Sequence, residues 1–363
     1  MKKVCFIQPL VANYCVPLFD ELGKHCQLTV VYSSVEQGKG YGEACVDSLT
    51  HVRWLEIPTL KPCGDKVGMY QANIIKHIRD EKPDAVIIFA NVRYTSFWTT
   101  LLWCKLNNIA VYPHGHGLYR KQEVTTIWKF IYKVITKLST QYICYTQSVA
   151  ESLLNQGIPP HKIAVAENSQ VNLFPVRSND KELIECGILF IGRLREGCNL
   201  DLLIEVITKL RVNAHPELTL HIIGDGENLE KYRLLAKELD YVRFYGGVYD
   251  ASIISEISKK CVLGCYPGNA GLSVVHMMSL SLPVITHSEM WQHQGPEPSY
   301  IKDGINGVLY DNSCASKSLY SALKHILDKD MDDLQAMQGA AFNTYNGLMS
   351  PTLAKRFIKI LDA

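Results

Sequence analysis

The segment Tyr266–Ser273 joins an apolar strand to an apolar helix through the small-residue loop Pro-Gly-Asn-Ala-Gly-Leu. A helix that begins near Gly271 leaves the N–H groups at 271–273 without acceptors inside the helix. Such N–H groups bind anions, and glycine allows a phosphate to approach the backbone closely. The residues that would line such a site are Gly268, Asn269, Gly271, Leu272 and Ser273. An ordinary strand–helix turn can have the same composition, and this alternative stays open.

Two arginines follow another strand-like segment, GILFIG at 187–192. Arg193 stands at the carboxyl end of this strand, where its planar guanidinium could bind two phosphate oxygens at once. Arg195 could supply a second cation from a neighbouring position. The competing interpretation of Arg193 is a strand-end arginine in a surface ion pair.

His276 lies one helical turn after Ser273, among Val275, Met277 and Met278. From this position its ring could donate a hydrogen bond to a ribose hydroxyl held beside the phosphates. A lone histidine in an apolar helix can equally be a core residue with satisfied hydrogen bonds. Both interpretations are kept.

Gly224 and Asp225 end a third strand, LTLHIIG, just before Gly226. A flexible Gly-Asp-Gly at a strand end predicts either the edge of a ligand cleft or a plain turn. The motif is not Gly-x-Gly-x-x-Gly, so a dinucleotide site is only weakly indicated.

Two histidines flank Gly115 in the segment Pro113-His-Gly-His-Gly117, after the strand IAVY. We expect a loop here, and His114 and His116 at the carboxyl end of a strand suit contact with a polar substrate. Histidines at i and i+2 without a nearby cysteine or carboxylate make a weak metal site, so no metal site is predicted.

Strands and helices alternate along the chain. Short apolar runs predict buried parallel strands. In the first half these are VCFIQ (4–8), LTVVY (28–32), VRWLEI (52–57), AVIIFA (85–90), IAVYPH (109–114), YICYT (142–146) and IAVA (163–166). In the second half they are GILFIG (187–192), LTLHIIG (218–224), VRFYG (242–246), CVLGCYP (261–267) and PVITH (283–287). Helical patterns lie between them, as at Val16–Lys24, Gly68–Glu81 and Asp201–Val212. This alternation predicts an α/β fold with parallel sheets covered on both faces.

The pattern restarts halfway, which predicts two doubly wound domains, residues 1–173 and 174–349, facing each other across a cleft. Proline, asparagine and charged residues break the periodicity near 173–186. Residues 350–363 form an amphipathic helix that could return to the first domain. Open α/β sheets bind ligands at the carboxyl ends of their strands, which favours a nucleotide-like ligand.

Composition narrows the function classes. At 363 residues, with 47% apolar and 20% charged residues, the chain can build two sizeable cores. The net charge of +1 gives no argument for a nucleic-acid partner. The twelve cysteines are scattered without a Cys-x-x-Cys motif, which favours reduced thiols and a cytoplasmic location. Gln8 and Pro9 interrupt the first apolar run, so we expect a buried strand in preference to a signal peptide, and no window suits a membrane span.

Five segments of the second half, taken in order, resemble the GT-B fold retaining glycosyltransferases of glycosyltransferase family 4, also called group 1. They are FIGRLREGCNLDLLIEV (190–206), LHIIGDGENLEKYRLLAKEL (220–239), VRFYGGV (242–248), PGNAGLSVVHMMSLSLPVITH (267–287) and IKDGINGVLYD (301–311). The first half resembles the family more loosely, through QPLVANYCVPLFDEL (8–22), the HGHG segment and IAVAENSQV (163–171). The resemblance implies two Rossmann-like domains, the second of which binds the nucleotide-sugar donor and the first of which faces the acceptor.

The resemblance also implies roles for single residues. Arg193 matches the family arginine that holds the diphosphate, and 271–273 match the loop whose N–H groups meet the phosphates. His276 falls where the family has the second glutamate of Glu-x7-Glu, which grips the ribose. His116 aligns with a first-domain histidine near the transferred sugar. The predicted catalytic residues are therefore His116 and Arg193.

Three positions depart from the family's pattern. Gly268 replaces the first glutamate of Glu-x7-Glu, and His276 replaces the second. Cys198 falls where the family has a lysine that partners the arginine, which removes a cation from the leaving diphosphate. A charge-assisted contact contributes about 1.5–3 kcal/mol, and Arg195 could substitute for it.

The segment Thr125–Leu138 carries Lys129, Lys133 and Lys137 at intervals of four, opposite an apolar face. A basic amphipathic helix with tryptophan and tyrosine can lie on an anionic membrane, although a domain helix with a solvated lysine edge is the alternative. The resemblance implies a lipid-linked or oligosaccharide acceptor for surface polysaccharide, and hence peripheral contact with the inner membrane face through 125–138. The predicted acceptor contacts are Asn13, Tyr14 and His114.

The expected activity is hexosyl transfer from a nucleotide-diphosphate sugar, with a UDP-sugar as the expected donor and no cofactor. Arg193 and the helix N-terminus would stabilise the leaving diphosphate, which predicts metal-independent transfer. Retention of anomeric configuration is implied by the resemblance alone. Two alternatives stay open: a nucleotide-sugar epimerase, and a non-catalytic nucleotide-sugar or partner-binding module descended from the enzyme.

Overall fold

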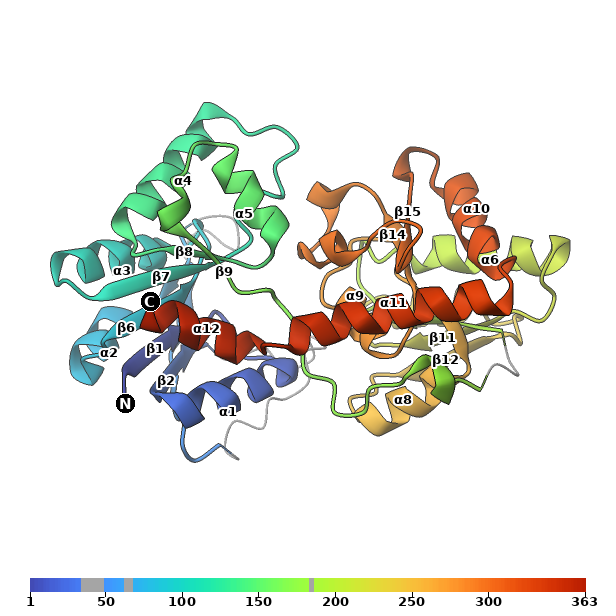
Figure 1. Cartoon of the computed structure of the whole chain (residues 1–363), viewed down its shortest axis with the longest axis horizontal. Coiled ribbons are helices and arrows are strands. Elements are labelled where there is room, and N and C mark those ends of the chain that lie inside the picture. Colours follow the sequence, from blue (N-terminus) through green and yellow to red (C-terminus); the bar gives the residue numbers. More distant parts are fainter. Residues whose placement is uncertain (34–48, 62–67, 183–185) are drawn as a thin grey trace. The chain divides into compact units, whose positions relative to one another are not determined.

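The computed structural model describes residues 1–33, 49–61, 68–182 and 186–363 (Figure 1). The chain divides into two compact units. Unit 1 comprises Met1–Asn168 and Pro351–Ala363, and unit 2 comprises Ser169–Ser350. Of the predicted boundary region 173–186, residues 183–185 lie outside the described residues.

Unit 1 is built on a parallel sheet with the strand order β3-β2-β1-β6-β7-β8-β9. Its strands are β1 (Lys3–Ile7), β2 (Gln27–Tyr32), β3 (Arg53–Glu56), β6 (Ala85–Phe89), β7 (Ala110–Gly115), β8 (Tyr142–Cys144) and β9 (Ile163–Val165). A separate antiparallel pair is formed by β4 (Thr59–Leu60) and β5 (Tyr70–Gln71). Residues 4–7 of β1 are all buried, as expected for a central strand covered by helices on both faces.

The helices of unit 1 are α1 (Val16–His25), α2 (Ile74–Glu81), α3 (Thr95–Leu106), α4 (Thr126–Leu138), α5 (Gln147–Leu154) and α12 (Leu353–Asp362), with short 3-10 turns η1 (Asn13–Cys15) and η3 (Pro160–Lys162). The predicted helix Gly68–Glu81 is wrong in its first part, because β5 occupies 70–71 and Asn73 has a left-handed φ of 62°. The helix α12 lies beside α1 (Figure 1). Its residue Phe357 also contacts Phe6 of β1, with ring centroids 5.5 Å apart.

Unit 2 is built on a second parallel sheet, with the order β12-β11-β10-β13-β14-β15. Its strands are β10 (Gly187–Ile191), β11 (Thr219–Ile223), β12 (Val242–Gly246), β13 (Cys261–Cys265), β14 (Val284–His287) and β15 (Gly307–Tyr310). The chain order reverses between β10 and β13, which makes the carboxyl edge there a topological switch point. The predicted α/β fold with two doubly wound parallel sheets is confirmed.

The helices of unit 2 are α6 (Leu200–Asn213), α7 (Leu229–Leu235), α8 (Ala251–Lys259), α9 (Ser273–Ser279), α10 (Ala315–Leu327) and α11 (Met331–Met349), with 3-10 turns η4 (Ser178–Asp180), η5 (Met290–Gln292), η6 (Glu297–Tyr300) and η7 (Asn312–Cys314). One apolar core joins them to the sheet. The helix α9 begins at Ser273, slightly later than predicted, with Leu272 as its N-cap residue. Within the described ranges, no helix combines the length and the apolar character that a membrane crossing needs.

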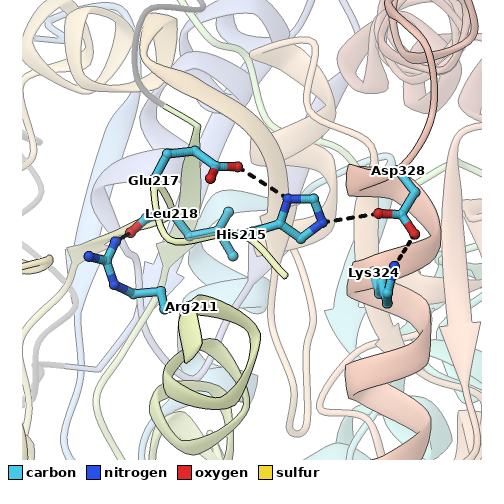
Figure 2. A network of polar contacts seen from close by, with 6 residues as sticks. All are labelled: Arg211, His215, Glu217, Leu218, Lys324 and Asp328. Atoms are coloured by element: carbon cyan, nitrogen blue, oxygen red, sulfur yellow. Dashed lines mark hydrogen bonds and ion pairs between the residues drawn. The ribbon is translucent and has the colours of Figure 1, made fainter. Parts of the chain in front are cut away.

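A polar network joins α6 to α10 before the start of β11 (Figure 2). The ring of His215 lies between two carboxylates, with Nδ1 3.1 Å from Glu217 and Nε2 3.1 Å from Asp328. Lys324 also donates to Asp328, and Arg211 donates to the carbonyl of the residue that precedes β11. The network connects the ends of α6 and α10. It lies at the amino end of the sheet and therefore away from the switch point at the carboxyl edge.

Candidate functional site

Three loops meet at the switch point of unit 2, after β10, β11 and β13. A Cβ atom on Gly224 would overlap the carbonyl oxygen of Gly192. A Cβ atom on Gly268 would likewise overlap the carbonyl oxygen of Gly197. Only glycine allows such close backbone approaches, so the three loops form one packed group.

The loop after β10 holds one side of the segment Pro267–Ala270. The N–H of Asn269 donates to the carbonyl of Gly197 at 2.8 Å. Arg195 donates to the carbonyl of Asn269 at 2.9 Å and to the side-chain oxygen of Gln294 at 2.6 Å. Arg195 therefore ties two segments of the site together, and its predicted contact with phosphate stays a prediction.

The segment 293–295 holds the other side of the same loop. The N–H of Ala270 donates to Nδ1 of His293 at 3.1 Å, and its carbonyl accepts from the N–H groups of Gln294 at 2.8 Å and Gly295 at 3.2 Å. The ring of His293 stacks on that of His287, with centroids 3.9 Å apart and planes 8° apart. Burial first, and His287 second, lower the pKa of His293 to about 3.

The N–H groups of Asn269 and Ala270 have acceptors, but those of the next three residues have none among the described residues. The N–H groups of Gly271, Leu272 and Ser273 donate to no acceptor within the described part of the chain, and all three residues are partly exposed. The predicted row of N–H groups at the start of α9 is thus present. Its binding of an anion stays a prediction.

Arg193 and His276 are both close in sequence to residues that lie at this row. A Cβ on Gly192 would lie 3.0 Å from Oγ of Ser273, and the N–H of His276 donates to the carbonyl of Leu272 at 3.0 Å. Arg193 lies just after β10, and its Nη2 is 3.6 Å from a carboxylate oxygen of Glu227, so the predicted alternative of an ion pair is realised. His276 is one turn into α9 and partly exposed, and burial of its ring lowers its pKa to about 4. Contacts of both residues with a nucleotide stay predictions.

The departure from the family pattern at Cys198 has a structural explanation. Its side chain is fully buried in the core of unit 2, and its Sγ lies 3.3 Å from the hydroxyl of Tyr232. A lysine at this position would place its ammonium in the core. The loop after β10 is therefore built around a small thiol.

The loop after β11 has the geometry of a tight turn. Asp225 accepts the N–H of Gly226 on its side chain at 2.7 Å, and its carbonyl accepts the N–H of Leu194 at 2.9 Å. These bonds join the loop to the one after β10. A role for Gly224 and Asp225 in ligand binding stays a prediction.

In unit 1, the predicted loop around the two histidines is corrected for His114. This residue lies within β7, and its ring is 3% exposed. The ring packs against Tyr145 and Phe357 at centroid distances of 4.3 and 4.8 Å, and burial lowers its pKa to about 3. Such burial argues against the predicted direct contact of His114 with an acceptor.

His116 follows β7 and is partly exposed. Its ring lies 4.5 Å from that of Tyr145 and 5.7 Å from that of Tyr119. Burial, and secondarily Arg120, lower its pKa to about 3.

Asn13 and Tyr14 form the exposed turn η1 after β1. Because carboxyl ends of parallel strands share one edge, these two residues and His116 belong to the same edge of the sheet of unit 1.

Reasoning from sequence missed two buried residues beside the loop after β13. They are His293, described above, and Glu297, whose side chain is 2% exposed and lies against Gly295 and Gly271. Neither belongs to a recognisable motif, since both follow the strand PVITH in the segment QHQGPEPSY. Across the described ranges, no three His, Cys, Asp or Glu side chains gather as ligands for a metal ion.

Comparison with family models covers most of the chain. Residues 11–169 match the model described as Glycosyltransferase Family 4, and residues 176–343 match the model described as Glycosyl transferases group 1. These two matches correspond to the two units.

Comparison with individual proteins gives a shorter match in sequence and a longer one in structure. The O-antigen biosynthesis glycosyltransferase WbnH and the probable O-antigen biosynthesis glycosyltransferase WbiN, both from Escherichia coli, are each 33% identical over 137 residues. That stretch covers 37% of this chain and 38% of each relative. The crystal structure of HepE from Anabaena in complex with UDP and glucose is similar over 100% of both chains, with a TM-score of 0.70 and 13% identity. The apo form of the lipopolysaccharide outer core galactosyltransferase WaaB covers 96% of this chain and 99% of its own, with a TM-score of 0.60 and 16% identity. The structural likenesses support the fold.

Proposed function

Because the chain belongs to the glycosyltransferases of group 1 and family 4, we propose that it transfers a hexose from a UDP-sugar to a saccharide or lipid-linked acceptor. Its relatives with 33% identity are named for O-antigen biosynthesis, and this supports a role in surface polysaccharide synthesis. The observation that carries the proposal is the set of N–H groups at 271–273, which have no acceptor in the described part of the chain. They lie at the switch point of unit 2, directly after a loop that is held by hydrogen bonds to neighbouring segments.

In the proposed reaction, the bond from the anomeric carbon to the diphosphate breaks and a bond to the acceptor oxygen forms. The anomeric carbon becomes positive in the transition state while the diphosphate gains negative charge. The dipoles of the N–H groups at 271–273 and the positive charge of the Arg193 guanidinium stabilise the negative charge on the diphosphate. The acceptor's proton passes to the departing phosphate oxygen. Transfer is proposed to be metal-independent and retaining.

Two histidines have proposed roles as neutral hydrogen-bonding groups. The pKa of His276 is lowered to about 4, so at neutral pH its ring binds the ribose hydroxyls without a charge. The pKa of His116 is lowered to about 3, so its ring can contact the transferred sugar without repelling the positive anomeric carbon. Asn13 and Tyr14 are the proposed acceptor contacts.

The helix α4 is the proposed contact with an anionic membrane that carries a lipid-linked acceptor. Ile127 and Phe130 are 71% and 67% exposed, although both are large and apolar. Lys129, Lys133 and Lys137 are exposed on the same helix. Apolar insertion combined with lysine attraction to anionic lipid is how an interfacial helix binds.

The decisive experiment is an assay of the purified protein with a panel of UDP-sugars, with and without a lipid extract and with a chelator present. Release of UDP together with a glycosylated product of retained configuration would support the proposal. A new UDP-sugar without release of UDP would identify an epimerase. Binding without any turnover in the presence of lipid acceptors would identify a non-catalytic module.

A further inference from the structure

Both polar backbone groups of Ala270 are held by one short segment that is distant in sequence. Its N–H donates to Nδ1 of His293 at 3.1 Å, and its carbonyl accepts from the N–H groups of Gln294 and Gly295. The N–H groups that the proposed function uses begin at the very next residue, Gly271. The placement of Ala270 therefore sets the start of that row.

The hydrogen bonds of His293 fix it in a single state. Its Nδ1 accepts from Ala270, so the proton must be on Nε2, which donates to the carbonyl of His287 at 2.9 Å. The ring is 1% exposed and is stacked on His287. A neutral ring with one defined tautomer is thus built into the support of the loop.

The loop contains two glycines, so hydrogen bonds from outside it help to fix its backbone. Glycines at 268 and 271 leave the backbone with many accessible conformations when nothing external holds it. Other external bonds come from Arg195, which donates to the carbonyl of Asn269, and from Gly197, which accepts from the N–H of Asn269. Thr286 donates to the carbonyl of Gly268 at 3.4 Å, and Tyr310 donates to the carbonyl of Pro267.

We propose that His293 is a positioning residue of the donor site, which rests on the proposed function. Its Nδ1 holds the Ala270 amide so that the N–H groups at 271–273 stand ready for the donor diphosphate. His293 does not touch the donor. Its contribution is to donor affinity and to kcat/KM for the donor, through the shape of the loop.

Two polar substitutions separate the two hydrogen bonds of the ring. In His293→Asn the side-chain oxygen can replace Nδ1 and still accept from Ala270. In His293→Gln the longer amide reaches the position of Nε2, which keeps a bond to His287 and leaves the Ala270 amide without its acceptor. Both variants lose the stacked ring, and glutamine, the variant expected to be impaired, fills more of the ring's volume than asparagine does.

The measurement is the Kd of uridine, guanosine, adenosine and thymidine diphosphate by titration calorimetry, at a temperature where circular dichroism shows each variant folded. We expect His293→Gln to raise the Kd of the preferred diphosphate and the KM of its sugar donor about tenfold, and His293→Asn to change them less than about threefold. The control is His221→Gln in β11. His221 is also fully buried and has two hydrogen-bond partners, Thr219 at 3.0 Å and Tyr245 at 2.8 Å. This control should lower the Tm and leave the Kd unchanged.

Equal Kd values for His293→Asn and His293→Gln would overturn the inference, because packing alone would then explain the residue. An increase in Kd for His221→Gln equal to that for His293→Gln would also overturn it, as a general effect of destabilisation. Failure of the wild type to bind any of the four diphosphates would instead overturn the proposed function, and the inference with it.

Discussion

Gly268 lies so close to Gly197 that a Cβ atom on Gly268 would overlap the Gly197 carbonyl oxygen. This contact joins the loops after β10 and β13 at the centre of the site. It also explains why the family's glutamate cannot be restored at position 268. Any side chain there would have to push the two loops apart.

The first prediction follows from that contact. Gly268→Ala should lower the free energy of unfolding by about 1–3 kcal/mol, since the new methyl group must displace backbone. It should also weaken UDP binding, because the loop moves. Denaturant titration and calorimetry measure the two effects.

The matched control is Gly339→Ala in α11, where a new Cβ would meet nothing within 4 Å. An alanine in a helix interior is favoured over glycine by about 0.5–1 kcal/mol, so this variant should be slightly more stable than the wild type. Equal effects of the two substitutions would contradict the assigned contact.

The second prediction concerns the buried thiol of Cys198. Cys198→Lys restores the family's lysine in sequence, but burial of an ammonium beside Tyr232 should lower stability by roughly 1–3 kcal/mol or more. Cys198→Ser keeps a small group that can bond the Tyr232 hydroxyl and should be affected less. Improved activity of the lysine variant at unchanged stability would show that the thiol is not buried as described.

The third prediction tests Arg193. Arg193→Ala should raise the Kd of the preferred nucleoside diphosphate by about 10- to 100-fold, as expected for loss of one charge-assisted contact. Arg233→Ala removes another arginine of unit 2, one that pairs with Glu230 at 2.9 Å on α7, and should leave this Kd unchanged. If both variants raise the Kd equally, Arg193 contributes only through the net charge of unit 2 and does not contact the diphosphate.

The fourth prediction is acid sensitivity. His114 and His293 are buried, and their pKa values are lowered to about 3. Below about pH 6.5 the unfolded chain takes up protons on these rings while the folded chain does not, so stability should fall by about 1.4 kcal/mol per pH unit for each ring. Above pH 6.5 neither ring contributes to the pH dependence, because it is neutral in both states.

His114→Leu isolates one of these contributions. Both ring nitrogens of His114 are buried without a hydrogen-bond partner in the described part of the chain, so leucine costs no polar contact. Denaturant titrations at pH 7 and pH 5 should show a smaller loss of stability for the variant than for the wild type. An unchanged loss would mean that the ring of His114 is accessible to protons in the folded state.

The fifth prediction concerns α4. The double substitution Ile127→Ser with Phe130→Ser should reduce sedimentation with phosphatidylglycerol vesicles by at least about tenfold, because each buried side chain of this size contributes about 1.5–3 kcal/mol. Val212→Ser is the control, since Val212 is 80% exposed in unit 2. Vesicle binding that is equal in all three proteins would exclude α4 as the contact.

The sequence predicted those parts of the fold that depend on local pattern. The apolar runs became strands of both sheets, although β15 (Gly307–Tyr310) was not among the predicted strands. The small residues before Ser273 became a loop that ends in N–H groups without an acceptor in the described residues. The helix expected from Gly68 began only at Ile74, because a left-handed Asn73 and a short strand precede it. Local periodicity cannot detect such a backbone reversal.

The support of the site could not be predicted, because it depends on contacts between distant residues. Ala270 and His293 are 23 positions apart, and Arg195 and Gln294 are 99 apart. None of these four residues lies in a sequence motif that identifies its hydrogen-bond partner. The burial of His114 was missed for the same reason, since Phe357 covers its ring from the far end of the chain.

The composition of unit 1 from Met1–Asn168 and Pro351–Ala363 has a consequence for biosynthesis. Phe6 and Phe357 meet in its core, so that core lacks an aromatic neighbour until α12 has emerged from the ribosome. Unit 2 is one uninterrupted stretch of chain, so all of its residues are synthesised before those of α12. We therefore expect the core of unit 1 to be completed only after every residue of unit 2 has been synthesised.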